Sequence, residues 1–254
     1  FIILVVIRLV TGRNYIGSYL AGGGGASSPA ASRGAATISP EEDRSAQLVS
    51  FVLNDVQNTW TTLLPEQTGK QYRHAKLVLF RDYTQSGCGV AKSQTGPFYC
   101  PEDEKVYIDL GFWDELRQLG GSTADFAQAY VIAHELGHHV QNILGVEQKV
   151  QQLSGRNPAQ RNPLSVDLEL QADCFAGVWG HVKQASLQID DADLREALNA
   201  AHQIGDDTLS QGRGDPSQYT HGTSEQRMRW FKRGFDSGDA RQSDTWGVRE
   251  YNQL

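Results

Sequence analysis

The chain has 254 residues, of which 39% are apolar and 21% charged, so it has the length and apolar content for a folded domain with a hydrophobic core. Its 23 Lys and Arg residues stand against 30 Asp and Glu residues, which gives a formal net charge of −7. Because nucleic-acid binding requires a basic surface, we expect no nucleic-acid partner.

The first 20 residues begin with an apolar run. Residues 1–10 contain one charged side chain, Arg8, whereas a membrane span needs about 20 apolar residues. The chain starts with Phe1 and its one methionine is Met228, so we interpret residues 1–20 as the remainder of a transmembrane segment. A buried strand and a signal-peptide core are the alternatives. This interpretation predicts a single-pass membrane anchor, with the folded domain in the periplasm or outside the cell.

Residues 21–37 are predicted to form a flexible tether, because Gly, Ser and Ala dominate them without an apolar periodicity. The folded domain is then expected over residues 38–254. Its first element is predicted to be a helix, with Ser39 as the N-cap and Pro40 at the first helical position. This helix is expected to end just before Pro65.

A group of short strands is predicted next. Residues 76–80 are mostly apolar and are predicted to form a buried strand, and the polar, Gly-containing residues 84–97 are expected to be a loop. Residues 98–100 and 106–110 flank a short polar turn and are predicted to pair as a hairpin. We expect an exposed edge of this hairpin to accept an extended peptide as an additional strand.

Helices dominate the second half of the domain. A long helix is predicted from Ala124 to about Leu144, where Gly145 ends it. The other predicted helices cover residues 112–119, 147–153, 164–187, 191–209 and 224–235, with a loop at 154–163. Strands followed by helices favour an α+β fold with a small antiparallel or mixed sheet over alternating βαβ units.

The pattern H-E-x-x-H occurs at His134, Glu135 and His138, inside the long predicted helix. Residues i and i+4 of a helix lie one turn apart on one face, so both imidazoles can bind one metal ion with Glu135 beside it. Apolar residues precede the motif, and buried imidazoles are costly unless they are paired or metal-bound. Two hydrogen-bonded core histidines are the alternative. We favour a site for one Zn²⁺ per chain.

Hydrolytic zinc needs a third protein ligand and an open position for water. Gln141 and Leu144 stand where a metzincin would have Gly and His, which excludes that class. Glu169 and Asp173 lie at i and i+4 on an apolar predicted helix. Glu169 therefore fits as the third ligand, and Asp173 as the acceptor for a ligand imidazole N–H. A solvated acidic helix face that includes Asp167 is the alternative.

These residues resemble the glutamate-zincin (gluzincin) pattern and, more closely, the bacterial neutral zinc metallopeptidase family. The matching stretches are residues 96–101, 127–135, 169–174, 204–207 and 220–227, and the resemblance covers roughly residues 38–250. It implies a zincin-like metallopeptidase fold with several C-terminal helices, and zinc bound by His134, His138 and Glu169. It also implies catalysis by Glu135, which would act as general base and acid on a peptide or protein substrate.

His221 is our candidate for a second stabiliser of the negative charge that develops on the substrate oxygen. It precedes a predicted helix start at Thr223 and so lies on a loop, where active-site donors often occur. A structural or surface histidine is an equal alternative. His139 faces about 100° away from His138 on the helix and is interpreted as structural. Asp206 either supports the site or lies in a solvated turn.

The cysteines give information on the cellular compartment in which the protein folds. Cys88 and Cys100 flank a Gly-containing loop, and a disulfide between them would indicate an oxidising compartment; free thiols are the alternative. Cys174 has no evident partner. The main functional alternative to a peptidase is a non-catalytic, zinc-stabilised scaffold or binding domain. Glu135 favours hydrolysis, since a structural zinc site gains nothing from a base at that position.

Overall fold

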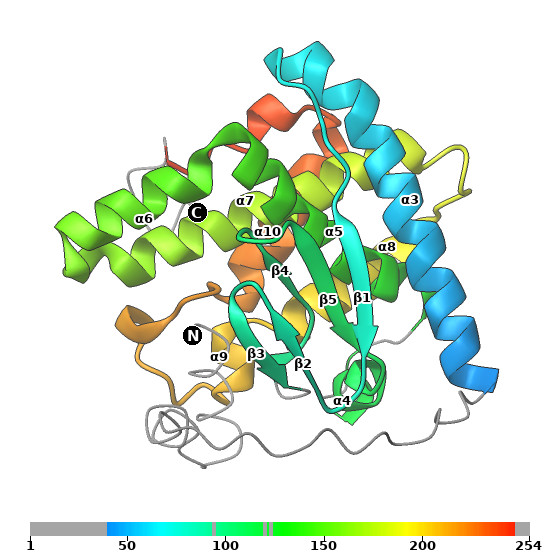
Figure 1. The fold of residues 1–254 in the computed structure, drawn as a ribbon, viewed down its shortest axis with the longest axis horizontal. Coiled ribbons are helices and arrows are strands. Elements are labelled where there is room, and N and C mark those ends of the chain that lie inside the picture. Colours follow the sequence, from blue (N-terminus) through cyan, green and yellow to red (C-terminus); the bar gives the residue numbers. More distant parts are fainter. Residues whose placement is uncertain (1–39, 93–94, 119–120, 122–123, 247–254) are drawn as a thin grey trace.

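The computed structural model describes residues 40–92, 95–118, 121 and 124–246. The expected membrane segment and tether lie outside these residues. Within the described part of the chain, no helix is both long and apolar enough to cross a membrane. The described residues form a mostly helical α+β structure with two small sheets. Figure 1 shows the strands at the front, with α5 (Asp125–Leu144) and α10 (Ser224–Ser237) behind them.

The first helix, α3 (Pro40–Thr68), is longer than the sequence predicted. Pro65 lies inside it rather than after it, so the expected end was wrong. A proline removes one backbone hydrogen bond, but Leu64 is fully buried in the core, and the Thr68 hydroxyl donates to the Leu64 carbonyl at 2.7 Å. Gly69 follows the last helical residue, and its φ of 73° is the left-handed conformation that glycine adopts without strain.

Three strands form a mixed sheet in the order β1 (Lys76–Phe80), β5 (Lys105–Asp109) and β4 (Phe98–Cys100). Strand β1 pairs in parallel with β5, and β4 pairs antiparallel with β5. The predicted strand at 76–80 and the predicted hairpin are therefore confirmed, but the first strand is only partly buried, with Phe80 as its one buried residue. Strand β4 lies at one edge of this sheet, but its Tyr99 and Cys100 side chains are buried, so the edge is less exposed than expected.

The region expected to be a loop contains a second hairpin, β2 (Tyr83–Ser86) and β3 (Gly89–Lys92). Its strands are polar and lack the alternating apolar pattern that identifies a strand from sequence. Contacts from outside hold its turn in place: the Gly87 amide donates to Asp103 at 2.9 Å, and Cys88 forms a disulfide with Cys100 of β4. The predicted disulfide is confirmed, and Cys174 is free and buried.

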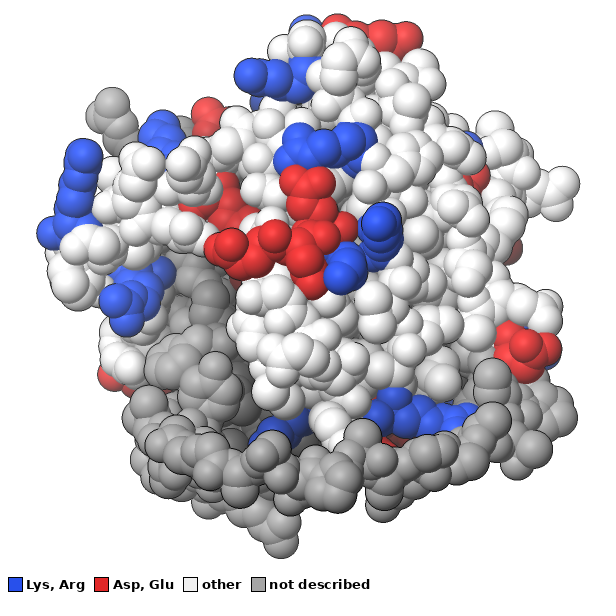
Figure 2. Space-filling model, in the orientation of Figure 1, with Lys and Arg blue, Asp and Glu red and all other residues white. Residues whose placement is uncertain are grey.

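Acidic side chains gather near the middle of the face shown in Figure 2, with basic side chains beside them. Glu104, just before β5, forms an ion pair with Arg73, just before β1. Asp103 accepts a hydrogen bond from the Tyr107 hydroxyl at 2.5 Å and lies 3.3 Å from the Lys105 ammonium. These contacts tie the turn before β5 to the segment that enters β1, and so help set the parallel register of the two strands.

Helices make up the rest. They are α4 (Phe112–Gln118), α5, α6 (Val146–Arg156), α7 (Arg161–Lys183), α8 (Asp191–Gln203), α9 (Asp206–Leu209) and α10, with short 3₁₀ turns η2 (Pro158–Gln160), η3 (Pro216–Gln218) and η4 (Ala240–Gln242). The loop expected at 154–163 was mostly wrong, because Pro163 sits in the first turn of α7, where a proline is tolerated. The helix expected over 191–209 is interrupted at Gly205, where a Cβ would lie 2.4 Å from the Ser224 amide nitrogen.

Small residues bring α5, α7 and α10 close together. A Cβ added at Gly137 of α5 would lie 2.9 Å from the carbonyl oxygen of Ala172 in α7. On another side of α7, Gly177 packs against the Phe231 backbone of α10, and Gly234 packs against the Cys174 backbone. The helix that carries H-E-x-x-H thus lies directly against the helix that carries Glu169 and Asp173.

Candidate metal centre

Helices α5 and α7 bring His134, His138 and Glu169 together, as the sequence predicted. One ligand atom from each residue lies within 4.8 Å of the other two. The Glu169 carboxylate lies 3.1 Å from His134 Nε2 and 3.5 Å from His138 Nε2. Burial alone would raise the pKa of Glu169, but the neighbouring histidines hold it well below its usual range. Two imidazoles and an ionised carboxylate therefore converge on one point.

The other side of the His134 ring faces Asp173, one helical turn beyond Glu169. His134 Nδ1 lies 2.7 Å from Asp173 Oδ1, and the Asp173 side chain is completely buried. An ionised carboxylate at this distance accepts the proton of Nδ1, so Nε2, on the side that faces Glu169, is the nitrogen that can bind a metal ion. This contact agrees with the one predicted for Asp173. The alternative of a solvated acidic face is wrong for this residue.

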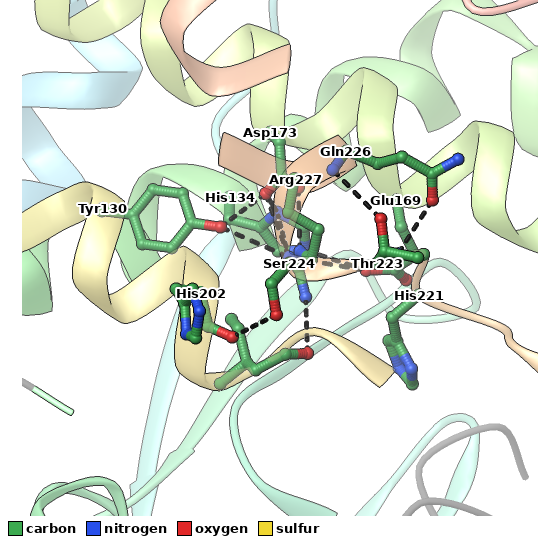
Figure 3. Close-up of polar contacts among 12 residues, drawn as sticks. Tyr130, His134, Glu169, Asp173, His202, His221, Thr223, Ser224, Gln226 and Arg227 are labelled. Atoms are coloured by element: carbon green, nitrogen blue, oxygen red, sulfur yellow. Dashed lines mark hydrogen bonds and ion pairs between the residues drawn. The ribbon is translucent and has the colours of Figure 1, made fainter. Parts of the chain in front are cut away.

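Arg227 is a residue of the site that the sequence reasoning did not assign. Its side chain from α10 is 2% exposed, and its guanidinium donates to both carboxylate oxygens of Asp173, at 2.8 and 3.0 Å. The Tyr130 hydroxyl also donates to Asp173, at 2.6 Å. Figure 3 shows Arg227 in the middle of this group, with Tyr130, His134 and Asp173 around it. Burial alone would raise the pKa of Asp173, but Arg227 and His134 outweigh it and lower that pKa.

A sequence signal for Arg227 does exist. The buried positions of α10 include Arg227, Trp230, Phe231, Gly234 and Phe235, which recur at helical spacing. A charged residue inside an apolar helix stripe requires a buried partner. The sequence alone does not say which carboxylate that partner is, because Asp173 lies 54 residues away.

Gln141 orients the second imidazole. Its side-chain oxygen lies 2.9 Å from His138 Nδ1, and its amide nitrogen donates to the Leu168 carbonyl of α7 at 2.7 Å. With the Gln141 oxygen accepting the Nδ1 proton, His138 Nε2 faces Glu169 and is the nitrogen that can bind a metal ion. Gln141, which stands where a metzincin would have Gly, thus links α5 to α7.

Glu135 lies beside the two histidines and is 7% exposed. Its burial raises the pKa of its carboxyl group, and the nearby His134 and His138 only partly oppose this. A carboxylate with a raised pKa is a stronger base in its ionised form. The environment of Glu135 therefore suits a general base.

His221 and Asp206 form a second buried pair. Asp206 is 5% exposed, and its Oδ2 accepts hydrogen bonds from the amides of Thr220, His221 and Gly222 at 2.7, 2.7 and 3.2 Å. Its Oδ1 lies 3.1 Å from His221 Nδ1. Burial alone would lower the pKa of His221, but Asp206 and Glu169 outweigh it and raise that pKa. Asp206 is therefore not in a solvated turn; it holds the His221 ring within electrostatic reach of Glu169.

His139 is structural, as interpreted from the sequence. It is fully buried, with Nδ1 2.8 Å from the Tyr99 hydroxyl and Nε2 2.6 Å from the Arg73 carbonyl oxygen. The Asn142 amide also donates to the Tyr99 hydroxyl, at 2.9 Å. These bonds fix strand β4 against the side of α5 next to the candidate metal ligands.

Comparison with known proteins agrees with this geometry. Residues 1–246 match the model of the family described as "Putative neutral zinc metallopeptidase". The chain belongs to this family. Among its relatives in the family, YpfJ of Escherichia coli K12 is 50% identical over 250 residues, which cover 97% of this chain and 86% of YpfJ. Rv2575 of Mycobacterium tuberculosis H37Rv is 42% identical over 211 residues, which cover 78% of this chain and 69% of Rv2575. Both relatives are described as uncharacterized, and no solved structure matches the chain.

Proposed function

We propose that the protein is a zinc-dependent metallopeptidase of the zincin type, with one Zn²⁺ held by His134, His138 and Glu169. The observation that carries the proposal is the convergence of these three ligand atoms within 4.8 Å, next to Glu135. Zinc bonds of about 2.1 Å at tetrahedral angles place ligand atoms about 3.4 Å apart. His134 Nε2 lies 3.1 Å from Glu169 Oε2, and His138 Nε2 lies 3.5 Å from Glu169 Oε1, so each nitrogen is near that spacing from one oxygen of the carboxylate.

The chemistry divides between the metal and the protein. Zinc held by His134, His138 and Glu169 would lower the pKa of a bound water and polarise a substrate carbonyl. Glu135 takes the proton from the attacking water and later delivers it to the leaving amine. Asp173 and Gln141 keep the two imidazoles in the tautomer that presents Nε2.

His221 is the proposed donor to the oxygen that becomes negatively charged during attack. The raised pKa of its ring favours the protonated form, in which both nitrogens are donors. With Nδ1 directed to Asp206, Nε2 remains to donate to substrate. Asp206 acts through His221 and is a positioning residue.

Strand β4 provides a place for an extended peptide beside this centre. It is an outer strand of its sheet, and Tyr99 on β4 contacts His139 and Asn142 of α5, close to His138. A peptide that pairs with this edge would run past the candidate metal ligands. We therefore propose a peptide or protein as the substrate.

We also propose that the domain works outside the cytoplasm, anchored through residues 1–20. The disulfide between Cys88 and Cys100 supports an oxidising compartment, because such bonds are rarely maintained in the cytosol. The anchor itself remains an expectation from the apolar sequence of its first residues.

The test is the cleavage of casein and a broad peptide library by the zinc-loaded protein and its Glu135→Gln variant. We expect Glu135→Gln to bind zinc like the wild type and to cleave about 10²–10⁴-fold more slowly, because the general base is lost. Glu225→Gln is a matched control, since the Glu225 side chain is 81% exposed. Full activity in Glu135→Gln would contradict the mechanism. Zinc binding without cleavage by the wild type would favour the alternative of a non-catalytic scaffold.

A further inference from the structure

A cavity of about 210 Å³ lies between the start of α7 and the segment around η3. It is lined by Asn162, Pro163, Val166, Pro216, Ser217 and Tyr219. Its most buried lining side chains are Val166, which is 1% exposed, and Tyr219, which is 6% exposed, whereas both prolines are exposed. Among the residues that the structure describes, no charged side chain lines it. The cavity therefore suits an apolar group that enters from solvent.

The cavity is lined by two segments that also carry residues of the candidate site, α7 and the chain just before His221. Val166 is three residues before Glu169 in α7, about 4.5 Å along the helix axis, and Asn162 lies seven residues before Glu169 on the same face. Tyr219 is two residues before His221 in the chain. A Cβ added at Gly222, the residue after His221, would lie 3.2 Å from Val166 Cγ1. The helix with the candidate carboxylate ligand and the loop with His221 thus meet at this cavity.

Local contacts keep the walls in place without a ligand. Pro163 and Pro216 have fixed φ angles. The Asn162 side-chain amide donates to the Ser217 carbonyl oxygen at 3.0 Å, which links α7 to η3 across the cavity wall. The Asp215 side chain caps η3 by accepting from the Ser217 amide at 2.9 Å. A cavity that is already formed loses little conformational entropy when it is filled.

We propose that this cavity receives an apolar side chain of the peptide substrate, within two residues of the cleaved bond. The proposal rests on the proposed peptidase function and adds a substrate preference to it. An extended peptide advances about 3.4 Å per residue, so one or two residues cover the rise of about 4.5 Å between Glu169 and Val166 along the α7 axis. An engineered protein cavity of about 150 Å³ holds benzene, so 210 Å³ accommodates a leucine or phenylalanine side chain.

The test measures binding without hydrolysis. Fluorescein-labelled peptides that differ only by Leu, Phe, Ala or Asp at one position are titrated against zinc-loaded Glu135→Gln and followed by fluorescence anisotropy. We expect Leu and Phe to bind about tenfold or more tightly than Ala, and Asp to bind most weakly. Equal affinities, tightest binding of Asp, or no binding of any peptide would overturn the proposal.

Two variants made in the Glu135→Gln background locate the effect. Pro163→Trp places a large side chain at the exposed rim, and Val166→Met fills the floor; each should reduce the Leu-to-Ala affinity ratio to near one. Pro158→Trp is the matched control, because Pro158 is also exposed and does not line the cavity. If Val166→Met fails to fold, the rim variant still decides. An unchanged ratio in Pro163→Trp would overturn the assignment.

Cleavage by the wild type separates this proposal from the proposed function. If the wild type cleaves no peptide but the apolar preference is present and is lost in Pro163→Trp, the peptidase function fails and the cavity assignment stands. If the wild type cleaves peptides with a preference that Pro163→Trp does not change, the peptidase function stands and the cavity assignment fails. In the expected result, cleavage occurs within two residues of Leu or Phe, and Pro163→Trp abolishes that preference.

Discussion

Arg227 shows how much of the site depends on groups behind the candidate metal ligands. Its guanidinium and the Asp173 carboxylate are both almost fully removed from water, which is costly unless each satisfies the other. The Tyr130 hydroxyl and His134 Nδ1 complete the hydrogen bonds of Asp173. The His134 ring is thus fixed by a charge pair that joins α5, α7 and α10.

Removing Arg227 should therefore destabilise the whole domain. We expect Arg227→Met to lower the free energy of unfolding by about 3–5 kcal/mol in urea titrations, because Asp173 is left as a buried charge without its partner. Arg229→Met is the control, since Arg229 makes an exposed ion pair with Glu225 and such pairs contribute little. The double variant Arg227→Met/Asp173→Leu should be less destabilised than Arg227→Met alone. A loss below about 1 kcal/mol for Arg227→Met would contradict the buried-pair argument.

The sequence predicted the candidate metal ligands better than the residues behind them. The candidate ligands and Asp173 were predictable, because they form two pairs that are each separated by one helical turn within one helix. The pairs are His134 with His138 and Glu169 with Asp173. Gln141 and Arg227 were not predictable, because their roles depend on contacts between helices far apart in sequence. Asp206 was left undecided, since adjacent acidic residues near Gly205 are equally typical of a solvated turn. Its burial comes from the loop that folds over it.

Among the elements, the crossing of α7 and α10 depends on having no side chain at two positions. A Cβ at Gly177 would lie 2.0 Å from the Phe231 carbonyl oxygen, and one at Gly234 would lie 1.9 Å from that of Cys174. Such contacts are with backbone, which cannot rotate away. This crossing also sets the position of Arg227 relative to Asp173.

Gly177→Ala should consequently force the two helices apart. We expect it to lower the free energy of unfolding by about 1–3 kcal/mol or more, the usual range for overpacking, despite the better helix propensity of alanine. Gly155→Ala in α6 is the matched control: nothing lies within 4 Å of its Cβ position, and it should be neutral or slightly stabilising. Thermal or urea unfolding measures both. Equal stability of the two variants would show that the crossing tolerates a side chain.

Helices and strands were predictable to different degrees. The apolar period and Gly145 gave α5 its bounds to within one residue. A short apolar run predicted β1, and the polar turn between two short strands predicted β4 and β5. The hairpin of β2 and β3 was missed, because its polar strands are held by Asp103 and the disulfide rather than by an apolar face. Pro65 was misleading, because burial of Leu64 keeps the last turn of α3 helical.

At the scale of the whole molecule, one disulfide joins the two small sheets. It closes a loop of 12 residue steps between Cys88 and Cys100, with Cα atoms 5.8 Å apart. Closing a loop of this length removes conformational entropy from the unfolded chain that corresponds to about 3 kcal/mol. The bond therefore contributes to global stability as well as holding the β2–β3 turn against β4.

We expect reduction, or the Cys88→Ser/Cys100→Ser double variant, to lower the free energy of unfolding by about 2–4 kcal/mol. Cys174→Ser separates the effect of the bridge from that of thiols in general, since Cys174 is buried and not bridged. Mass spectrometry of alkylated protein, with and without prior reduction, checks that one bridge is present in the native chain. Two alkylated thiols at Cys88 and Cys100 without reduction would refute the pairing.

The central claim is that Glu169 of α7 completes a zinc site with His134 and His138 of α5. The most direct measurement is zinc stoichiometry and affinity by competition with a chelator, for the wild type, Glu169→Ala and the exposed control Glu225→Ala. We expect one zinc per chain in the wild type and the control, and an affinity at least about 100-fold weaker in Glu169→Ala, because a direct ligand contributes more than an outer hydrogen-bond partner. Glu169→Ala that bound one zinc with unchanged affinity would contradict the account.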